Sequence, residues 1–297
     1  MTDFLVSIVM PSYNSGLHIK KAIDSVIAQT YVKWELIIID NFSSDQTIDI
    51  VSSYSNDKIK IFKIHNEGII AKSRNLGIQE SSGSLIAFLD SDDWWAVNKL
   101  SESVKYIQSG YDIVYHALKI VNNSNRIIFQ KTTYTKNFEN NLYSKLIEHG
   151  NFISNSSVVV KKYYLEAISY ISEDVDLIAA EDYDCWLKIS KLTNRFYCIN
   201  KSLGYYFYNG TGANTLEKQI CNLEYLKNKY INKYIDATGT PMPVWVMYFD
   251  LKFSYDKKNY KKSQILIKAL IKRDLTNIIK LKIFFILVKS KFNYFLT

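Results

Sequence analysis

Cysteine, proline and glycine are all scarce in this chain. Its 297 residues include 3 cysteines, 3 prolines and 10 glycines. So little proline and glycine argues against long disordered linkers. Cys185, Cys198 and Cys221 have neither the spacing of metal ligands nor an even number for pairing. The composition therefore argues against a disulfide framework and favours a protein of the reducing cytoplasm.

Long hydrophobic runs are also missing. The apolar start Phe4–Met10 follows Asp3, where a signal peptide carries positive charge, and Pro11 cuts the run short. We therefore expect a first strand there and not a secretion signal. Near the other end, the apolar run Ile283–Val288 is far below the roughly 20 residues that cross a bilayer. No transmembrane helix is predicted.

Positive charge is concentrated in one part of the sequence. Residues 252–297 contain 12 Lys or Arg against 2 Asp or Glu, whereas the remainder contains 25 against 27. The main part therefore lacks the charge of a nucleic-acid-binding protein. The lysines around the apolar run, Lys280, Lys282, Lys289 and Lys291, favour an anionic membrane surface as a partner. The alternative is a solvated basic face on an ordinary helical tail.

The first hundred residues alternate between strand and helix patterns. Apolar runs of strand length occupy 5–10, 34–40, 59–64 and 84–89, and helix-like patterns occupy 17–30, 44–54 and 71–80 between them. This alternation predicts an α/β fold, with a mostly parallel, Rossmann-like sheet flanked by helices and joined by right-handed crossovers.

The rest of the chain is less regular and then purely helical. Two further strands, which would extend the sheet with mixed directions, are expected at DIVYHALKIV and RIIFQK. They are followed by a short helix at 140–148, a strand at 156–160 and an amphipathic helix at 179–192. FYCIN and LGYYFY resemble a hairpin that ends in the Gly-rich loop 209–212. Helical patterns then fill 214–235, 244–255, 260–272 and 277–291. We expect one α/β domain at 1–213 and a helical, basic C-terminal region at 214–297.

Polar side chains stand where successive strands should end, at Pro11–Asn14, Asp40 and Asp90–Asp93. Ligands of open α/β sheets bind beyond the carboxyl ends of the strands. The first turn, PSYNSG, lacks the G-x-G-x-x-G of dinucleotide sites, and no G-x-x-x-x-G-K-[ST] loop is present. Carboxylates at a strand end suit magnesium and a phosphorylated ligand. The alternative for Asp90–Asp93 is a polar turn that caps the next helix.

Five motifs together carry a family resemblance. VSIVMPSYN, QTYVKWELIIIDNFSSDQT, GIIAKSRNLGI, GSLIAFLDSDDWW and AEDYDCWLK occur in the order, and at about the spacing, of family 2 glycosyltransferases with the GT-A fold. The resemblance covers about residues 4–215. It implies that 1–213 form a GT-A nucleotide-sugar-binding and catalytic domain. It also implies an inverting transferase that uses a nucleotide-diphospho-sugar and a divalent metal. We expect the donor to be a UDP-sugar and the metal to be Mn²⁺ or Mg²⁺.

The resemblance implies nucleotide-binding positions at Pro11, Tyr13, Asn14, Asp40 and Arg74. Asp40 would bind the uracil or the ribose, and Arg74 would lie near the nucleotide or the diphosphate. A turn carboxylate is the alternative for Asp40. Asn41-Phe42-Ser43 follows where the family usually has Asp-Gly-Ser, and this departure affects the expected loop geometry more than the role of Asp40. Phe207 and Asn209 stand where relatives often have Arg and His, so no diphosphate clamp is expected from that loop.

The stretch Asp90, Ser91 and Asp92 matches the Asp-x-Asp element of the family. Asp92 is the expected main metal ligand. Asp90 would contact the ribose or hold the metal through water. Asp93 either joins these carboxylates or caps the next helix.

The pair Glu181-Asp182 matches the acidic pair of the family, whose aspartate resembles the catalytic base. Asp182 would take the proton from the attacking acceptor hydroxyl. Trp186, one helical turn later, would stack on the acceptor sugar, and Asn155 and Ser156 fall where relatives form part of the acceptor pocket. The alternatives are a core tryptophan and two acids that interact only with the helix dipole.

The functional hypothesis is transfer of a sugar, of glucose or galactose type, to a hydroxyl of a lipid-linked glycan in surface-polysaccharide or O-antigen synthesis. The enzyme would lie peripherally on the cytoplasmic face of the membrane. A noncatalytic nucleotide-sugar-binding scaffold is the alternative from another class. A nucleotidylyltransferase is a third hypothesis, although PSYN is not its Gly-rich triphosphate loop. The donor sugar, the linkage and the oligomeric state are open.

Overall fold

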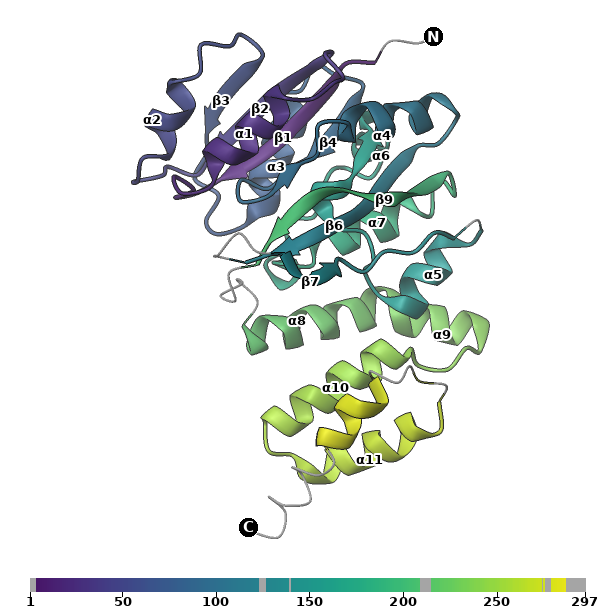
Figure 1. Ribbon diagram of the computed structural model, residues 1–297. Helices are drawn as coiled ribbons and strands as arrows, with labels where there is room; N and C mark the ends of the chain where they lie inside the picture. Colours follow the sequence, from purple (N-terminus) through teal and green to yellow (C-terminus); the bar gives the residue numbers. More distant parts are fainter. Residues whose placement is uncertain are drawn as a thin grey trace. The chain divides into compact units, whose positions relative to one another are not determined.

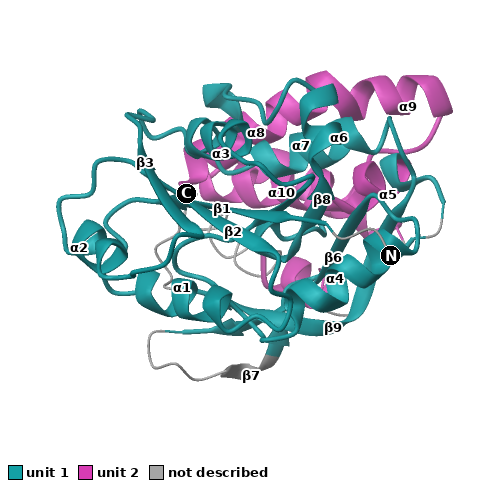
Figure 2. Cartoon of the chain, turned by 90° about the horizontal axis from the view of Figure 1, so that it is seen from above, with its two compact units in different colours: residues 1–143, 151–213 teal, residues 144–150, 214–297 magenta. Residues whose placement is uncertain are grey.

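The computed structural model describes residues 4–122, 127–138, 140–208, 215–273, 275 and 279–286. The chain divides into two compact units (Figure 2). The first unit comprises residues 1–143 and 151–213, and the second comprises 144–150 and 214–297. The short segment 144–150, which the sequence assigned to the α/β domain, belongs to the second unit because its contacts lie there. The functional assignment of the two units stays a prediction.

The first unit is built on a sheet whose first half is parallel. The strand order β3-β2-β1-β4 comprises β3 (Ile59–Lys63), β2 (Trp34–Asp40), β1 (Val6–Ser12) and β4 (Leu85–Phe88). Every residue of β1, β2 and β4 is buried, as their continuous apolar runs indicate for strands covered on both faces. The register pairs Ser12 with Asp40 and Val9 with Phe88. These three strands therefore end at the same edge of the sheet.

The second half makes the sheet mixed. The order continues β8-β6-β9-β5, and β7 pairs with β6 off this path. These strands are β8 (Val159–Lys161), β6 (Ile113–Val121), β9 (Phe196–Phe207), β5 (Trp94–Trp95) and β7 (Ile127–Thr132). β8 is antiparallel to both β4 and β6, whereas β6 and β9 are parallel. The parallel character predicted from the sequence therefore holds for the first half and for one later pair.

The hairpin expected from FYCIN and LGYYFY is wrong, because both segments form the single strand β9. The polar residues Asn200–Ser202 suggested a turn. In the structure the register with β6 shifts instead, since His116 pairs with Ile199 and Ala117 pairs with Ser202. The irregularity absorbs the extra residues while β9 continues. The predicted loop 209–212 lies outside the described residues.

Helices cover the sheet (Figure 1). In the first unit they are α1 (Ile19–Ile27), α2 (Thr47–Ser52), α3 (Ile70–Gln79), α4 (Lys99–Gln108), α6 (Lys162–Ala167) and α7 (Glu181–Ile189), with the 3₁₀ turns η1 (Asn155–Ser157) and η2 (Val175–Leu177). α5 (Leu142–His149) leads into the second unit. α1 buries Ile19, Ala22, Ile23 and Val26, the residues whose spacing predicted it.

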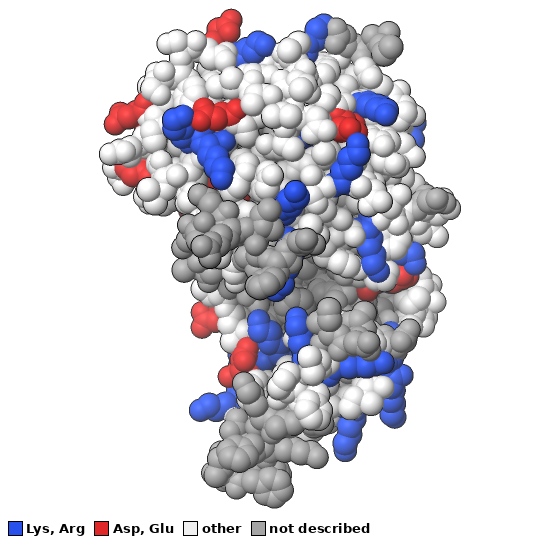
Figure 3. Space-filling model, in the orientation of Figure 1, with Lys and Arg blue, Asp and Glu red and all other residues white. Residues whose placement is uncertain are grey.

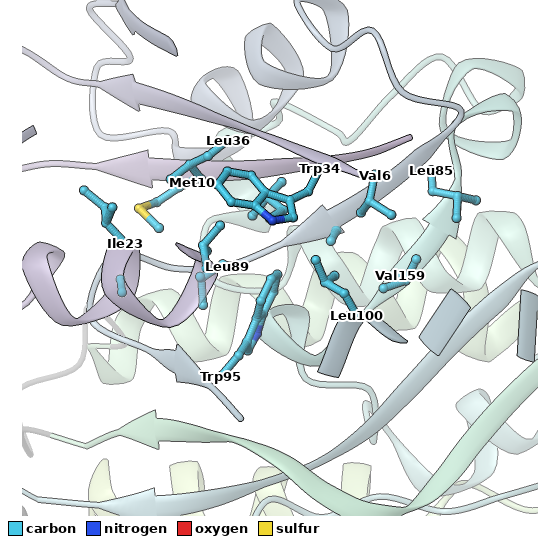
Figure 4. Close-up of a cluster of buried hydrophobic side chains, with 14 of the residues drawn as sticks. Val6, Met10, Ile23, Trp34, Leu36, Leu85, Leu89, Trp95, Leu100 and Val159 are labelled. Carbon is cyan, nitrogen blue, oxygen red and sulfur yellow. The ribbon is translucent and has the colours of Figure 1, made fainter. Parts of the chain in front are cut away.

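The main core lies between the first strands and the helices on one face of the sheet. Figure 4 shows five of its side chains pointing toward one another: Met10, Leu36, Ile23, Leu89 and Trp95. The buried residues of this cluster are 0–5% exposed. Burial of such side chains stabilises a fold by about 1.5–3 kcal/mol each. This core fixes the edge of the sheet at which the predicted site residues lie.

The second unit is helical, as expected. It contains α8 (Leu216–Leu226), a π-helical turn η3 (Lys227–Ile231), α9 (Asn232–Thr238), α10 (Val244–Asp256) and α11 (Tyr260–Ile271), and residues 279–286 are also helical. Its core cluster includes Leu251, Ile267, Leu270, Leu275 and Ile283. Within the part of the chain that the structure describes, every helix is too short or too polar to cross a membrane.

Candidate active site

A cavity of about 600 Å³ lies beyond the ends of β1 and β4. It is placed there by the sheet register, since the first parallel strands all end at this edge. The residues that line it are Pro11, Ser12, Tyr13, Asn14, Ser15, Leu17, His18, Asn41, Asn66, Gly68, Ile70, Asp90, Ser91 and Asp92. Six of the eight predicted nucleotide-binding residues are therefore brought together here. The two exceptions are Asp40 and Arg74.

The turn after β1 is held by hydrogen bonds to two other strand ends. Asn14 has φ 46°, and its amide N donates to Ser43 Oγ at 2.9 Å, while its Oδ1 accepts from Ser44 N at 2.9 Å. The hydroxyls of Ser15 and Ser91 lie 2.7 Å apart. Tyr13 remains 60% exposed. The PSYN turn is thus tied to both neighbouring loops, and its tyrosine is accessible at the cavity.

Asp40 is not among the residues that line the cavity, and its contact with uracil or ribose stays a prediction. The residue is 0% exposed. Its two carboxylate oxygens accept from Ser43 N at 2.9 Å and from Ser43 Oγ at 2.5 Å. This is the turn carboxylate that the sequence left as the alternative. Asn41, the next residue, lines the cavity instead.

The Asp90–Asp93 turn presents its acids in different environments. Asp93 N donates to Asp90 O at 3.0 Å, which closes the turn. Burial and then the charge of Asp90 raise the pKa of Asp92 to about 6. Burial and the carboxylates of Asp92 and Asp90 raise the pKa of Asp93 well above its usual value. Asp93 is 1% exposed and accepts from Phe207 N at 2.9 Å, so it fastens β9 to the turn and does not cap the next helix.

Arg74 lies at the centre of a buried ion-pair network. It is 3% exposed. Its Nη2 donates to Asp90 Oδ1 at 2.8 Å and its Nη1 donates to Glu181 Oε1 at 2.6 Å. Burial alone would lower the pKa of Arg74, but the carboxylates of Asp90 and Glu181 raise it. The guanidinium therefore joins the carboxylate turn to α7. Its place near the nucleotide or the diphosphate stays a prediction.

Glu181 and Asp182 stand in the first turn of α7, where the helix dipole favours negative charge. Glu181 is 5% exposed and its Oε2 is buried without a hydrogen-bond partner among the described residues. Burial and the charge of Glu181 raise the pKa of Asp182 to about 7, against the opposing effect of Arg74. Asp182 Oδ2 accepts from Asn151 Nδ2 at 3.2 Å. A carboxylate with a pKa near neutrality is suited to general-base chemistry.

The three residues expected to bind the acceptor differ in their contacts. Trp186 is 0% exposed and packs against Phe88, with ring centroids 6.3 Å apart, so its assignment to the acceptor is wrong and it is a core tryptophan. Ser156 Oγ accepts from Asp90 N at 3.1 Å. The amide of Asn155, with its oxygen toward the guanidinium, accepts from Arg74 Nε at 3.1 Å. Asn155 and Ser156 thus support the ion-pair network from η1.

Several residues of the site were missed by sequence reasoning. His18, which none of the sequence motifs singled out as a site residue, lines the cavity and packs on Phe207 with ring centroids 4.3 Å apart. Asn41 Oδ1 accepts from Asn66 N at 2.9 Å, which joins two cavity-lining loops. A signal was available for Asn41, because it directly follows a predicted strand end. Nothing in the local sequence marks Asn66 or Asn151. Asn209 lies outside the described residues.

The donor set at the turn fits a hard divalent cation. Asp90 and Asp92 would supply oxygen ligands. Burial and then the charge of Asp90 raise the pKa of Asp92, and a cation bound at the turn would offset both effects. Over the described ranges, no group of three or more His, Cys, Asp or Glu side chains is gathered as a complete metal cage. Two carboxylates with phosphates as further ligands are the sparse protein contribution typical of magnesium.

The fold and the site together define a class of protein. An α/β sheet with an acid-rich turn and a cavity at its carboxyl edge, followed by a helix that begins with an acidic pair, is the arrangement of a GT-A glycosyltransferase. The S. aureus TarS 1-349 structure in complex with UDP matches with a TM-score of 0.59 at 20% identity, over 91% of this chain and 76% of that one. The Pyrobaculum calidifontis mannosyltransferase PcManGT, in complex with GDP-Man and Mn²⁺, matches with a TM-score of 0.58 at 15% identity, over 93% and 77%. These likenesses confirm the predicted fold.

The family follows from the sequence matches. The model of glycosyl transferase family 2 matches residues 7–167. The UDP-Glc:alpha-D-GlcNAc-diphosphoundecaprenol beta-1,3-glucosyltransferase WfgD of Escherichia coli is 35% identical over 199 residues, which are 65% of this chain and 73% of that protein. WfaP of Escherichia coli, with the same described activity, is 30% identical over 188 residues, 62% and 70%. The chain belongs to glycosyl transferase family 2 and is a glycosyltransferase.

Proposed function

We propose that this enzyme moves a hexose of glucose or galactose type from UDP to a hydroxyl of a lipid-linked glycan, with inversion, during surface-polysaccharide or O-antigen synthesis. The observation that carries this proposal is the network in which Arg74 joins Asp90 at the cavity to Glu181 at the start of α7. The network would connect the turn proposed to bind the diphosphate to the helix that carries the proposed base. The activities for which WfgD and WfaP are named support the choice of donor and of acceptor.

Proton transfer belongs to Asp182 in this mechanism. Its carboxylate accepts the proton of the acceptor hydroxyl as that oxygen forms a bond to the anomeric carbon. The bond from this carbon to the diphosphate breaks, and its electron pair leaves with UDP. Such a positioned base contributes about 10²–10⁴-fold to the rate. Because the displacement is single, the configuration at the anomeric carbon inverts.

Donor binding is assigned to the cavity. Tyr13, which is exposed, and Asn41 both line this cavity and would contact the nucleotide. Asp92 would hold a divalent cation, Mn²⁺ or Mg²⁺, with Asp90 supporting it. When bound, the cation supplies charge neutralisation of the leaving diphosphate. Arg74 keeps Asp90 in place from the buried side.

The membrane assignment depends on the surface of the second unit. Exposed apolar side chains gather there, with Ile265 and Ile271 62% exposed, Leu281 57%, and Phe284 and Phe285 56%. Lysines and arginines lie among the same helices, as Figure 3 shows for one face of the molecule. Apolar residues combined with a basic surface suit a helix that lies on an anionic membrane. The enzyme would thus meet its lipid-linked acceptor peripherally, on the cytoplasmic face.

The test is a donor panel with purified full-length protein. UDP-glucose, UDP-galactose and UDP-N-acetylglucosamine are each incubated with Mn²⁺ and a GlcNAc-diphospholipid acceptor. We expect a disaccharide-lipid only with a UDP-hexose, loss of product with EDTA, and a β linkage by NMR. Product from a different nucleotide sugar, or an α linkage, would overturn the donor or the stereochemical assignment.

A further inference from the structure

Asn151 is the residue that joins the second unit's segment 144–150 to the rest of the first unit. Its side-chain amide has a defined orientation, because Oδ1 accepts from Ile153 N at 3.1 Å. The nitrogen of the same side-chain amide, Nδ2, donates to Asp182 Oδ2 at 3.2 Å. A backbone group thus aims this side chain at one oxygen of the acidic pair.

The hydrogen bond acts on a carboxylate in a mixed electrostatic environment. Burial and the charge of Glu181 raise the pKa of Asp182, while Arg74, the amide of Tyr183 and Asn151 lower it. Tyr183 N donates to the other oxygen, Oδ1, at 2.7 Å. Because the Tyr183 bond comes from the next residue in the same helix, Asn151 adds a restraint from a different segment of the chain.

The peptide before Asn151 is fixed by α10. Trp245 Nε1 donates to Ile147 O at 2.8 Å. Its ring also lies against Gly150, where a Cβ would be 3.3 Å from Trp245 Cδ2. Gly150 has φ +77°, in the left-handed region that favours glycine. Trp245 therefore restrains both the carbonyl at Ile147 and the backbone immediately before Asn151.

We propose that Asn151 is a positioning residue for Asp182, and that Trp245 sets its position through Gly150. The C-terminal helices then influence proton transfer through the covalent chain. Because the second unit also carries the surface assigned to the membrane, this connection makes turnover depend on the state of those helices. The proposal rests on the proposed role of Asp182 as the base.

The first test replaces the amide in the full-length protein. Asn151→Ala is expected to lower kcat about tenfold, as for loss of one hydrogen bond to a charged group. UDP affinity by calorimetry with Mn²⁺ and the donor KM should not change. The pH midpoint of kcat should rise, because the lost bond favours the charged form of Asp182. Asn151→Asp, which removes the donor and adds a like charge, should shift the midpoint further.

A matched control is Asn56→Ala. Asn56 Oδ1 accepts from Lys58 N at 3.0 Å in the turn before β3, so this variant also loses one side-chain bond to a backbone amide. It should leave both kcat and the pH midpoint as in the wild type. An Asn151→Ala enzyme with wild-type kcat and pH midpoint would overturn the positioning role.

The second test addresses Trp245. Trp245→Ala should lower kcat and leave the UDP affinity unchanged. The Trp245→Ala/Asn151→Ala double variant should be no slower than Asn151→Ala alone, because both substitutions act through the side chain of Asn151. Trp245→Phe loses only the bond to Ile147 O and should have a smaller effect, which keeps the test available if the alanine variant does not fold. Phe253→Ala, in the same helix, controls for loss of an aromatic ring. Additive losses in the double variant would overturn the link to the second unit.

Asp182→Asn separates this proposal from the proposed function. If Asp182→Asn turns over at the wild-type rate, the base is elsewhere and the proposed function fails. If Asp182→Asn is inactive while Asn151→Ala retains the wild-type profile, only the positioning role fails. Loss of activity in the first variant and a raised pH midpoint in the second would support both.

Discussion

At the scale of single residues, the site is decided by which side chains hold the others. Arg74 was expected near the nucleotide or the diphosphate because it matches an arginine that the family resemblance places there. Its Nη1 and Nη2 instead bind Glu181 and Asp90, which is how a buried guanidinium and buried carboxylates satisfy one another. Two carboxylates 91 positions apart in the sequence thereby become parts of one site.

The raised pKa of Asp182 predicts a pH dependence of the rate. Only the carboxylate form can accept a proton, so kcat/KM should rise with pH through about 7, where the pKa of Asp182 lies in the free enzyme. The measurement is kcat/KM for the acceptor from pH 5 to 9. A rate independent of pH across this range would exclude Asp182 as the titrating group.

The same group predicts a stability effect. Because its pKa is raised in the folded state, its favourable contribution is fully present below the unfolded value near 4 and is lost as pH rises through about 7. Asp182→Asn should therefore raise Tm at pH 8 by about 2–4 °C per kcal/mol gained, measured without UDP or metal. At pH 4 the two proteins should melt together.

At the scale of elements, close packing of α3 on the sheet outweighs helix propensity. Gly77 lies within α3, where alanine is favoured by about 1 kcal/mol in an exposed helix. A Cβ at Gly77 would be 2.5 Å from Val9 Cγ1 and 3.3 Å from Ile39 Cγ1. The glycine thus lets the helix that carries Arg74 approach β1 and β2.

Gly77→Ala should therefore destabilise the protein in spite of its better propensity. Overpacking costs about 1–3 kcal/mol, which exceeds the gain, so urea unfolding should show a lower midpoint. In a Val9→Ala background the same substitution should cost less, because the overlapping methyl groups are gone. Equal costs in both backgrounds would show that the contact with Val9 is not the cause.

At the scale of the whole molecule, the chain combines an α/β unit, whose central strands are buried, with a basic helical unit that exposes large apolar side chains. Phe284 and Phe285 are each 56% exposed, and Lys280 and Lys282 are their neighbours in the sequence. We assign these residues to a membrane surface. Apolar burial would supply most of the affinity, and the lysines would make it depend on salt and on anionic lipid.

Vesicle sedimentation of the full-length protein tests this assignment. Phe284→Ser/Phe285→Ser should reduce binding to anionic vesicles at least tenfold, since each ring buries about 1.5–3 kcal/mol. Lys280→Ala/Lys282→Ala should reduce it by about fivefold per lysine, as about 1 kcal/mol each predicts. Val32→Ser, which removes an exposed apolar side chain of the first unit (66% exposed), is the matched control. Wild-type binding by both variants would contradict the assignment.

The sequence by itself determined the architecture and the approximate place of the site. Buried strands and amphipathic helices have short periods that are visible in any window, so the alternation of the first hundred residues predicted the parallel half of the sheet. The ends of β1 and β4 predicted Pro11, Tyr13, Asn14 and the Asp90–Asp92 turn, because parallel strands end at one edge.

Only the tertiary structure decided what each polar residue does. Two cases depend on neighbours distant in sequence: whether Arg74 binds a ligand or two carboxylates, and whether Trp186 stacks on a sugar or lies in the core. The Ser43 contact of Asp40 is local, but the burial of Asp40 arises only in the folded sheet. The hydrogen bond of Asn151 to Asp182 likewise joins two segments of the first unit that are separated in the sequence. Local patterns specify the period of an element, but burial and charge pairing arise only when elements far apart in the chain meet.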